Sequence, residues 1–132
     1  FRNGSTKVCS GRDITIVTLP SMFEKVKLAK NTLNNKGIYA EIIYVNTLKP
    51  FDKKIIYKSL NKTKKLLVVE DLSEHDGLLN LCLRSSNNIK NLKYNQIAIK
   101  DFIRSYGNYE TLCKKVGLTT KNIINQSLNL LK

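Results

Sequence analysis

Apolar and polar positions along this chain follow two different periods, which predicts strands and helices that alternate along the sequence. Ile14–Thr18 is rich in β-branched residues, and the strand that it predicts ends before Pro20, which has no N–H to donate to a sheet. Ser21 is placed to cap a helix after this strand, and Gly37 is placed to end that helix in a left-handed conformation. The helix presents apolar residues at helical spacing: Met22, Val26, Ala29 and Leu33.

The same strand and helix unit repeats in the next part of the chain. Ala40–Val45 predicts a second strand, and Asp52 is placed to cap the helix after it. That helix carries apolar residues at Ile55, Ile56 and Leu60. Residues 66–69 are apolar throughout, which indicates a third strand in a central position. Joints this short between strand, helix and strand predict right-handed crossovers and parallel pairing.

The second half of the chain continues the alternation. Residues 76–87 predict a third helix, and residues 96–99 predict a short fourth strand. Gly117 ends a fourth helix, and Thr119 or Thr120 caps the last one. The apolar residues expected on these three helices are, in order, Leu78, Leu79, Cys82 and Leu83; Tyr109, Leu112, Cys113 and Val116; and Ile124, Leu128 and Leu131.

These elements predict an α/β fold: a three-layer αβα sandwich with helices on both faces of a mostly parallel sheet of four or five strands. Ser5–Cys9 is the candidate fifth strand. The 132 residues suit a single domain, residues 1–132, and the start at Phe1 rather than at Met suggests a piece of a longer chain. Ligands in such sheets sit beyond the carboxyl ends of the strands, which in this chain are the loops at residues 19–21, 46–49, 70–75 and 100–101.

The composition of the chain argues against several classes of protein and site but does not by itself indicate a function. No apolar run approaches the roughly 20 residues that cross a bilayer, and we expect a cytoplasmic protein. Cys9, Cys82 and Cys113 are spaced too widely to form a zinc signature with the single histidine. Cys82 and Cys113 fall within apolar helical patterns, so we interpret these two as small buried thiols. The net charge of +13 favours an anionic partner, but 19 of the 23 basic residues are lysines scattered along the chain. Nucleic-acid binding is therefore a less favoured alternative.

Candidate chemistry is sparse. No phosphate-binding glycine motif of the common types occurs. His75 stands in an acidic stretch, residues 70–76, that suits either an acid/base or metal site or a solvated loop. Ser21 and Ser73 have no evident base partner. Arg104 suits either a phosphate contact or a surface ion pair with Asp101.

Several motifs, read in order, resemble one known family. They are GRDITIV at residues 11–17, LKPFD at residues 48–52 and VVED at residues 68–71. The tail adds IKDF at residues 99–102 and GLT at residues 117–119. This order resembles the C-terminal domain of the transketolase family, and is most similar to the C-terminal subunit of two-subunit transketolases, followed by deoxyxylulose phosphate synthase.

The resemblance implies a parent enzyme that uses thiamine diphosphate and magnesium to move two-carbon ketol units between phosphosugars. The cofactor of that family lies between a pyrophosphate-binding and a pyrimidine-binding domain, and neither domain is in this chain. The resemblance thus implies a structural and assembly domain that contributes no catalytic, cofactor-binding or metal-binding residue, is inactive alone, and joins a homo-oligomer through those two partner domains. A glycine-rich segment usual in the family is reduced to DGLLN at residues 76–80. The alternative is a module that docks a partner, as the equivalent domain does in 2-oxo acid dehydrogenase beta subunits.

Overall fold

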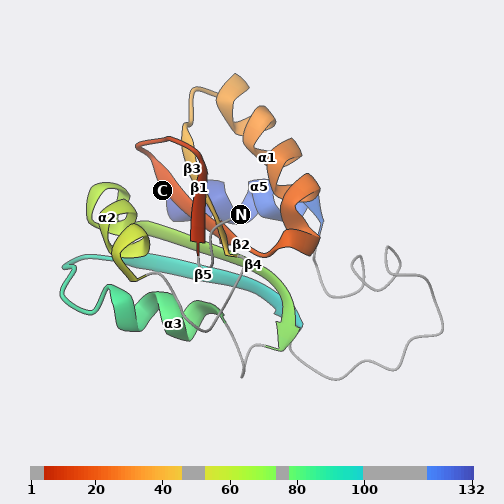
Figure 1. Ribbon diagram of the computed structural model, residues 1–132. Coiled ribbons are helices and arrows are strands. Elements are labelled where there is room, and N and C mark those ends of the chain that lie inside the picture. The colour runs from red at the N-terminus through yellow and green to blue at the C-terminus, as the bar shows by residue number, and fades with distance from the viewer. Residues whose placement is uncertain (1–4, 46–52, 74–77, 100–118) are drawn as a thin grey trace.

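The computed structural model describes residues 5–45, 53–73, 78–99 and 119–132 (Figure 1). Within these residues the strands form one five-stranded sheet in the order β1-β3-β2-β4-β5. The strands are Ser5–Cys9 (β1), Ile14–Thr18 (β2), Ala40–Val45 (β3), Lys65–Ser73 (β4) and Lys93–Ile99 (β5). The helices are a 3-10 turn at Pro20–Met22 (η1) and the α-helices Phe23–Asn35 (α1), Lys53–Thr63 (α2), Leu78–Ser85 (α3) and Thr120–Leu130 (α5).

The sheet is mostly parallel, as the alternation predicted. β2 pairs in parallel with β3 on one side and β4 on the other, and β4 pairs in parallel with β5. Ile16 in β2 stands opposite Ile42 in β3 and Leu67 in β4, which fixes the register at the middle of the sheet. β4, which carries the apolar stretch at residues 66–69, lies inside the sheet, next to the central strand β2. β1 is a true fifth strand and runs antiparallel along the edge of β3.

Helices cover both faces of the sheet, which confirms the three-layer arrangement. Figure 1 shows α1 and α5 on one face and α2 and α3 on the other. The first face buries a cluster built from β2, β3, β4, β5 and the two helices, including Ile16, Val26, Leu33, Ile42, Leu67 and Ile123. The second buries Val17, Ile43, Val45, Ile56, Leu60, Leu66, Val68, Leu78 and Cys82. Because helices cover both faces, every residue of β2 and residues 66–69 of β4 are buried, as expected of strands inside a parallel sheet.

The predicted boundaries of the first helix were half correct. Gly37 follows α1 with a φ of 80°, the left-handed conformation expected of a residue that ends a helix. Ser21 does not cap α1, because the chain after Pro20 first makes the turn η1 and Met22 occupies the N-cap position without a side-chain hydrogen bond. Proline at the start of a short 3-10 turn delayed the helix by two residues beyond the serine.

The last helix begins as predicted but buries a different row of side chains. The Thr119 hydroxyl accepts a hydrogen bond from the Asn122 N–H at 3.2 Å. The buried residues are Ile123, Ser127 and Leu130, whereas Ile124 and Leu128 of the expected row are only partly buried against the same cluster. Ser127 is tolerated in the core because its hydroxyl donates a hydrogen bond to the Ile123 carbonyl of the same helix at 2.8 Å. A polar residue at this position is the reason why the buried row was not recognised in the sequence.

Other predictions fall in segments outside the described residues. These are the caps at Asp52 and Asp76 and the helix over residues 109–116.

Candidate functional site

Glu70 is the described carboxylate at the carboxyl end of the sheet, where a ligand site was expected. It is fully buried and lies in the carboxyl half of β4, three residues before the strand ends. Its Oε2 accepts a hydrogen bond from the Leu78 N–H at 2.9 Å, and its Oε1 accepts one from the Gln96 amide at 2.6 Å. A carboxylate at the first N–H of a helix is favoured by the helix dipole. Glu70 therefore joins β4 to the start of α3 and to β5, and both of its oxygens are engaged by the fold.

Cys82 lies beside this carboxylate and is buried, as the sequence indicated. Burial, and then the negative charge of Glu70, raise the pKa of the Cys82 thiol far above its usual range. The thiol therefore stays protonated at neutral pH and is not a nucleophile. Cys9 is partly buried at the end of β1, and Cys113 lies outside the described residues.

Most of the remaining sequence candidates lie outside the described residues. His75 and its neighbour Asp76 belong to this group, as do Arg104 and Asp101. Ser21 is exposed in the turn η1. The structure thus brings Glu70 to the carboxyl end of the sheet but leaves the hypotheses for His75 and Arg104 as predictions.

A second buried carboxylate, Glu41, lies near the opposite end of the parallel strands and was missed by the sequence analysis. It is the second residue of β3 and only 2% exposed. The Lys62 ammonium, at the end of α2, lies 2.5 Å from Glu41 Oε1. The backbone N–H of Gly11 donates to the same oxygen at 3.4 Å, and the Lys7 ammonium lies 4.0 Å away.

Two opposing effects act on the pKa of Glu41, and the effect of its hydrogen-bonding partners is the larger. Burial alone would raise the pKa of the carboxyl group, because it disfavours the charged form. Hydrogen bonds from Lys62, Ser59 and the Gly11 N–H, together with the positive charge of Lys62, outweigh burial and hold the pKa of Glu41 below its ordinary value of 4.5. Glu41 is therefore a carboxylate at neutral pH.

Three buried hydroxyl groups extend this network into the layer between α2 and the sheet. The Thr15 hydroxyl, on β2, lies 2.7 Å from the Ser59 hydroxyl and 2.7 Å from the Thr63 hydroxyl. Ser59 and Thr63 are one helical turn apart on α2, so both meet the same strand. Because Ser59 also contacts Glu41, hydrogen bonds run without a break from Thr63 through Thr15 and Ser59 to the carboxylate.

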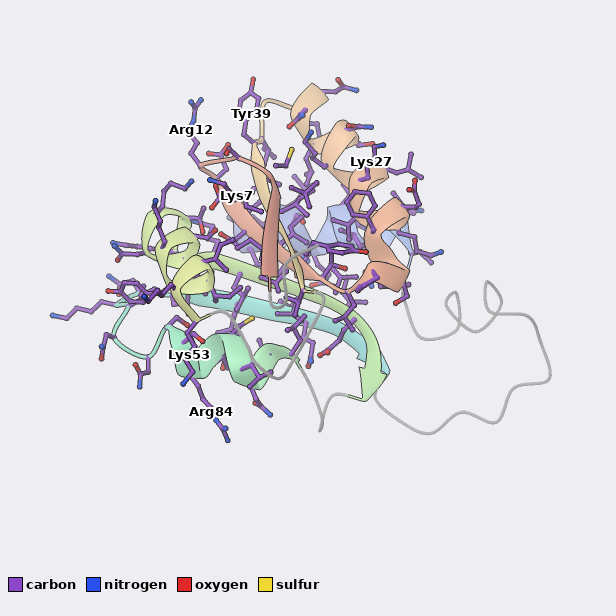
Figure 2. The ribbon with its side chains drawn as sticks, viewed as in Figure 1. Lys7, Arg12, Lys27, Tyr39, Lys53 and Arg84 are labelled. Carbon is purple, nitrogen blue, oxygen red and sulfur yellow. The ribbon has the colours of Figure 1, made fainter. Side chains whose placement is uncertain are left out.

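The network opens into a pocket between α2 and β1 with a volume of about 380 Å³. Figure 2 marks Lys7 on β1, the edge strand beside α2. The pocket is lined by Lys7, Glu41, Ile55, Lys58, Ser59 and Lys62. Three ammonium groups and one carboxylate around a partly apolar wall suit an anion better than a cation. We call this site the α2–β1 pocket.

A sequence signal for this site existed in α2. Ser59 and Thr63 share the buried face of the helix with Ile56 and Leu60, and hydroxyl residues inside an apolar row indicate a buried polar partner. Glu41 itself gives no such signal, because a single charged residue in a strand is more often placed at the solvent side.

The described residues contain neither a cluster of metal-ligating side chains nor a membrane-spanning helix. In residues 5–45, 53–73, 78–99 and 119–132, no three histidine, cysteine, aspartate or glutamate residues come together in a way that would hold a metal ion. No helix in this part of the chain is both long and apolar enough to cross a membrane. Both carboxylates that the fold buries, Glu41 and Glu70, already have donors.

Comparison with known proteins identifies the fold. The family described as "Transketolase, C-terminal domain" matches residues 4–123. A solved structure described as "Split gene transketolase, inactive beta4 tetramer" superposes with a TM-score of 0.89 at 25% identity, covering 99% of this chain and 43% of that one.

Two curated relatives belong to different transketolase-like enzymes. The 6-deoxy-6-sulfo-D-fructose transketolase subunit SqwH of Clostridium sp. (strain MSTE9) is 30% identical over 114 residues, which are 86% of this chain and 35% of that protein. The 1-deoxy-D-xylulose-5-phosphate synthase of Chlamydia muridarum is 30% identical over 125 residues, 93% of this chain and 20% of that protein. The chain thus spans only about a fifth to a third of the length of these relatives.

The α/β sandwich and the matched family define the class: the chain belongs to the family of transketolase C-terminal domains. The resemblance seen in the motifs at residues 11–17, 48–52 and 68–71 is confirmed, including its two branches, a two-subunit transketolase and deoxyxylulose phosphate synthase.

Proposed function

We propose that residues 1–132 form a single domain, the C-terminal structural and assembly domain of a longer, cytoplasmic, thiamine diphosphate-dependent enzyme that transfers two-carbon ketol units between phosphosugars. The family match over residues 4–123 carries this proposal. The active site of the enzyme then lies in domains other than this one.

The state of the buried ionisable groups supports a structural role. Glu70 ties α3 and β5 to β4, Glu41 ties α2 to β3, and Cys82 is protonated. Catalytic groups usually have a free face toward a substrate, whereas Glu70 and Cys82 are buried between the sheet and α3.

Thiamine diphosphate and magnesium belong, on this proposal, to the pyrophosphate-binding and pyrimidine-binding domains of the parent enzyme. Among the described residues, no three histidine, cysteine, aspartate or glutamate side chains are arranged to hold a magnesium ion. We assign no step of the reaction to this chain.

The parent enzyme is proposed to be a homo-oligomer held together with those two domains. Support comes from two relatives: the structural neighbour is described as a tetramer of a split-gene transketolase, and SqwH is named as a subunit. An assembly domain suits a protein family in which these parts occur as separate chains.

A binding measurement tests whether the cofactor binds to the other domains of the parent enzyme and not to this one. Thiamine diphosphate with magnesium is titrated by calorimetry into the full-length parent and, separately, into residues 1–132. We expect saturable binding by the parent and no heat of binding from the chain alone at concentrations that saturate the parent. Equal binding by both would place the cofactor in this domain and overturn the proposal.

A further inference from the structure

We propose that the α2–β1 pocket binds a small organic phosphate, a phosphate monoester whose dianion is held by Lys7 and Lys58. This site is separate from the proposed function, since it needs no cofactor and no other domain. It lies toward the amino ends of β2 and β3, away from the sheet edge where ligands were expected.

The size and walls of the pocket suit a small organic molecule. Its volume of about 380 Å³ falls in the range of small-molecule sites, roughly 300–1,000 Å³. Ile55 supplies an apolar wall for a carbon skeleton, and the Ser59 hydroxyl stands at the buried side. A bare inorganic phosphate would leave that apolar wall without a partner.

The charges around the pocket do not cancel. Three lysines and one glutamate line it, which leaves a net charge of +2. The negative charge of Glu41 is neutralised mainly by the Lys62 ammonium, 2.5 Å from Oε1. The Lys7 ammonium is 4.0 Å from the same oxygen, at the distance limit of an ion pair. Among the described residues Lys58 makes no ion pair. A dianion matches the charge that remains.

The sequence of α2 adds an independent argument for an anion. Lys54, Lys58 and Lys62 follow one another at intervals of four residues, and no acidic residue occurs in the helix. Like charges at this spacing repel one another and destabilise a helix. Glu41 offsets the repulsion at Lys62, the last lysine of the row, and an anion in the α2–β1 pocket would offset it at Lys58, the middle one.

The same contacts favour an anion over a metal ion. Oε1 of Glu41 is already shared by Lys62 and the Gly11 N–H, and the surrounding ammonium groups repel a cation. Lysine acts as a point charge that binds phosphate without demanding a fixed geometry, which suits side chains that project from a helix and an edge strand.

Calorimetric titration of the full-length protein with glycerol 3-phosphate tests the proposal. We expect saturable binding of glycerol 3-phosphate, weaker binding of inorganic phosphate, and none of uncharged glycerol. Lys58→Ala is expected to weaken the binding by about 10-fold or more, as the loss of one charged contact implies. Lys58 is exposed, so the variant should fold normally, which its unfolding temperature verifies.

Lys54→Ala is the matched control, because Lys54 is exposed one turn earlier on the same helix and does not line the pocket. We expect it to leave the affinity within about twofold, and Lys7→Ala to weaken binding as Lys58→Ala does.

Binding that Lys58→Ala does not change lies elsewhere and overturns the proposal. Equal losses in the Lys54 and Lys58 variants would show diffuse attraction instead of a site. Equal affinity for succinate would contradict the phosphate class.

Discussion

Glu41 on β3 and Lys62 at the end of α2 form an ion pair of 2.5 Å in which the carboxylate is 2% exposed and the ammonium side chain 47% exposed. The pair therefore has one buried and one half-exposed member. Removing either one has different consequences, because only the carboxylate depends on its partner to remain charged inside the protein.

Lys62→Ala is expected to lower the free energy of unfolding by about 1–3 kcal/mol, since it leaves a buried carboxylate with fewer donors. Denaturant unfolding measures the change. Lys54→Ala, about two turns earlier on the same helix, serves as the control and should stay within about 0.5 kcal/mol of the unchanged chain. Equal stability of the two variants would show that Glu41 does not need Lys62.

The contribution of Glu41 to stability should disappear in acid. Its pKa in the folded chain is lowered from the ordinary 4.5, so the folded state favours the carboxylate and this contribution is fully present above that value. As the pH falls through the lowered pKa, the carboxylate is protonated and the contribution is lost. The difference in unfolding free energy between the unchanged chain and Glu41→Gln should therefore be constant from about pH 6 to 8 and shrink below about pH 4.5. A difference that grows in acid would contradict this sign.

Thr15→Val tests the buried hydroxyl network. The substitution keeps the shape of the side chain but removes the hydroxyl that joins Ser59 and Thr63. We expect a loss of about 1–2 kcal/mol of stability, the cost of leaving buried polar groups short of a partner. Thr32→Val is the control, because the Thr32 hydroxyl bonds only to the Leu28 carbonyl in its own helix at an exposed site. A similar effect at both positions would argue against a special role for the network.

Gly11 and Gly37 should respond differently to the same substitution. A Cβ on Gly11 would lie 2.4 Å from the backbone carbonyl carbon of Ala40, which cannot move without displacing β3, so Gly11→Ala should cost about 2–3 kcal/mol. Gly37 has open space around it but a φ of 80°, so Gly37→Ala should cost only about 1 kcal/mol. Thermal unfolding of both variants measures the order, and a reversed order would contradict this account of the strand contact.

The fold was predictable because its signals are local. The strand Ile14–Thr18, the glycine after α1 and the cap at Thr119 each act within a few residues, and each was confirmed. The antiparallel pairing of β1 was not predictable, because it depends on contacts between residues far apart, such as Ser5 opposite Val45. The turn η1 was not predicted either, since its only effect on the helix is to move the N-cap by one residue, from Ser21 to Met22.

The candidate site was predictable only in part, through the hydroxyl residues Ser59 and Thr63 in the apolar row of α2, because its other contacts join distant parts of the chain. Glu41 and Lys62 are 21 residues apart and meet only when α2 packs on the sheet. Nothing in the strand pattern distinguishes Glu41 from a solvent-exposed glutamate. By contrast, the absence of glycine motifs and the isolated cysteines were readable from the sequence, since those chemistries require residues at fixed spacing.

The central claim is that this domain supports an enzyme whose chemistry takes place in other domains. Two-carbon ketol transfer between phosphosugars, assayed with thiamine diphosphate and magnesium, tests it most directly when the full-length parent and residues 1–132 are compared side by side. The account predicts turnover by the parent and none by the chain alone. Turnover by the chain alone, or a correctly folded parent that binds the cofactor and transfers no two-carbon unit, would contradict it.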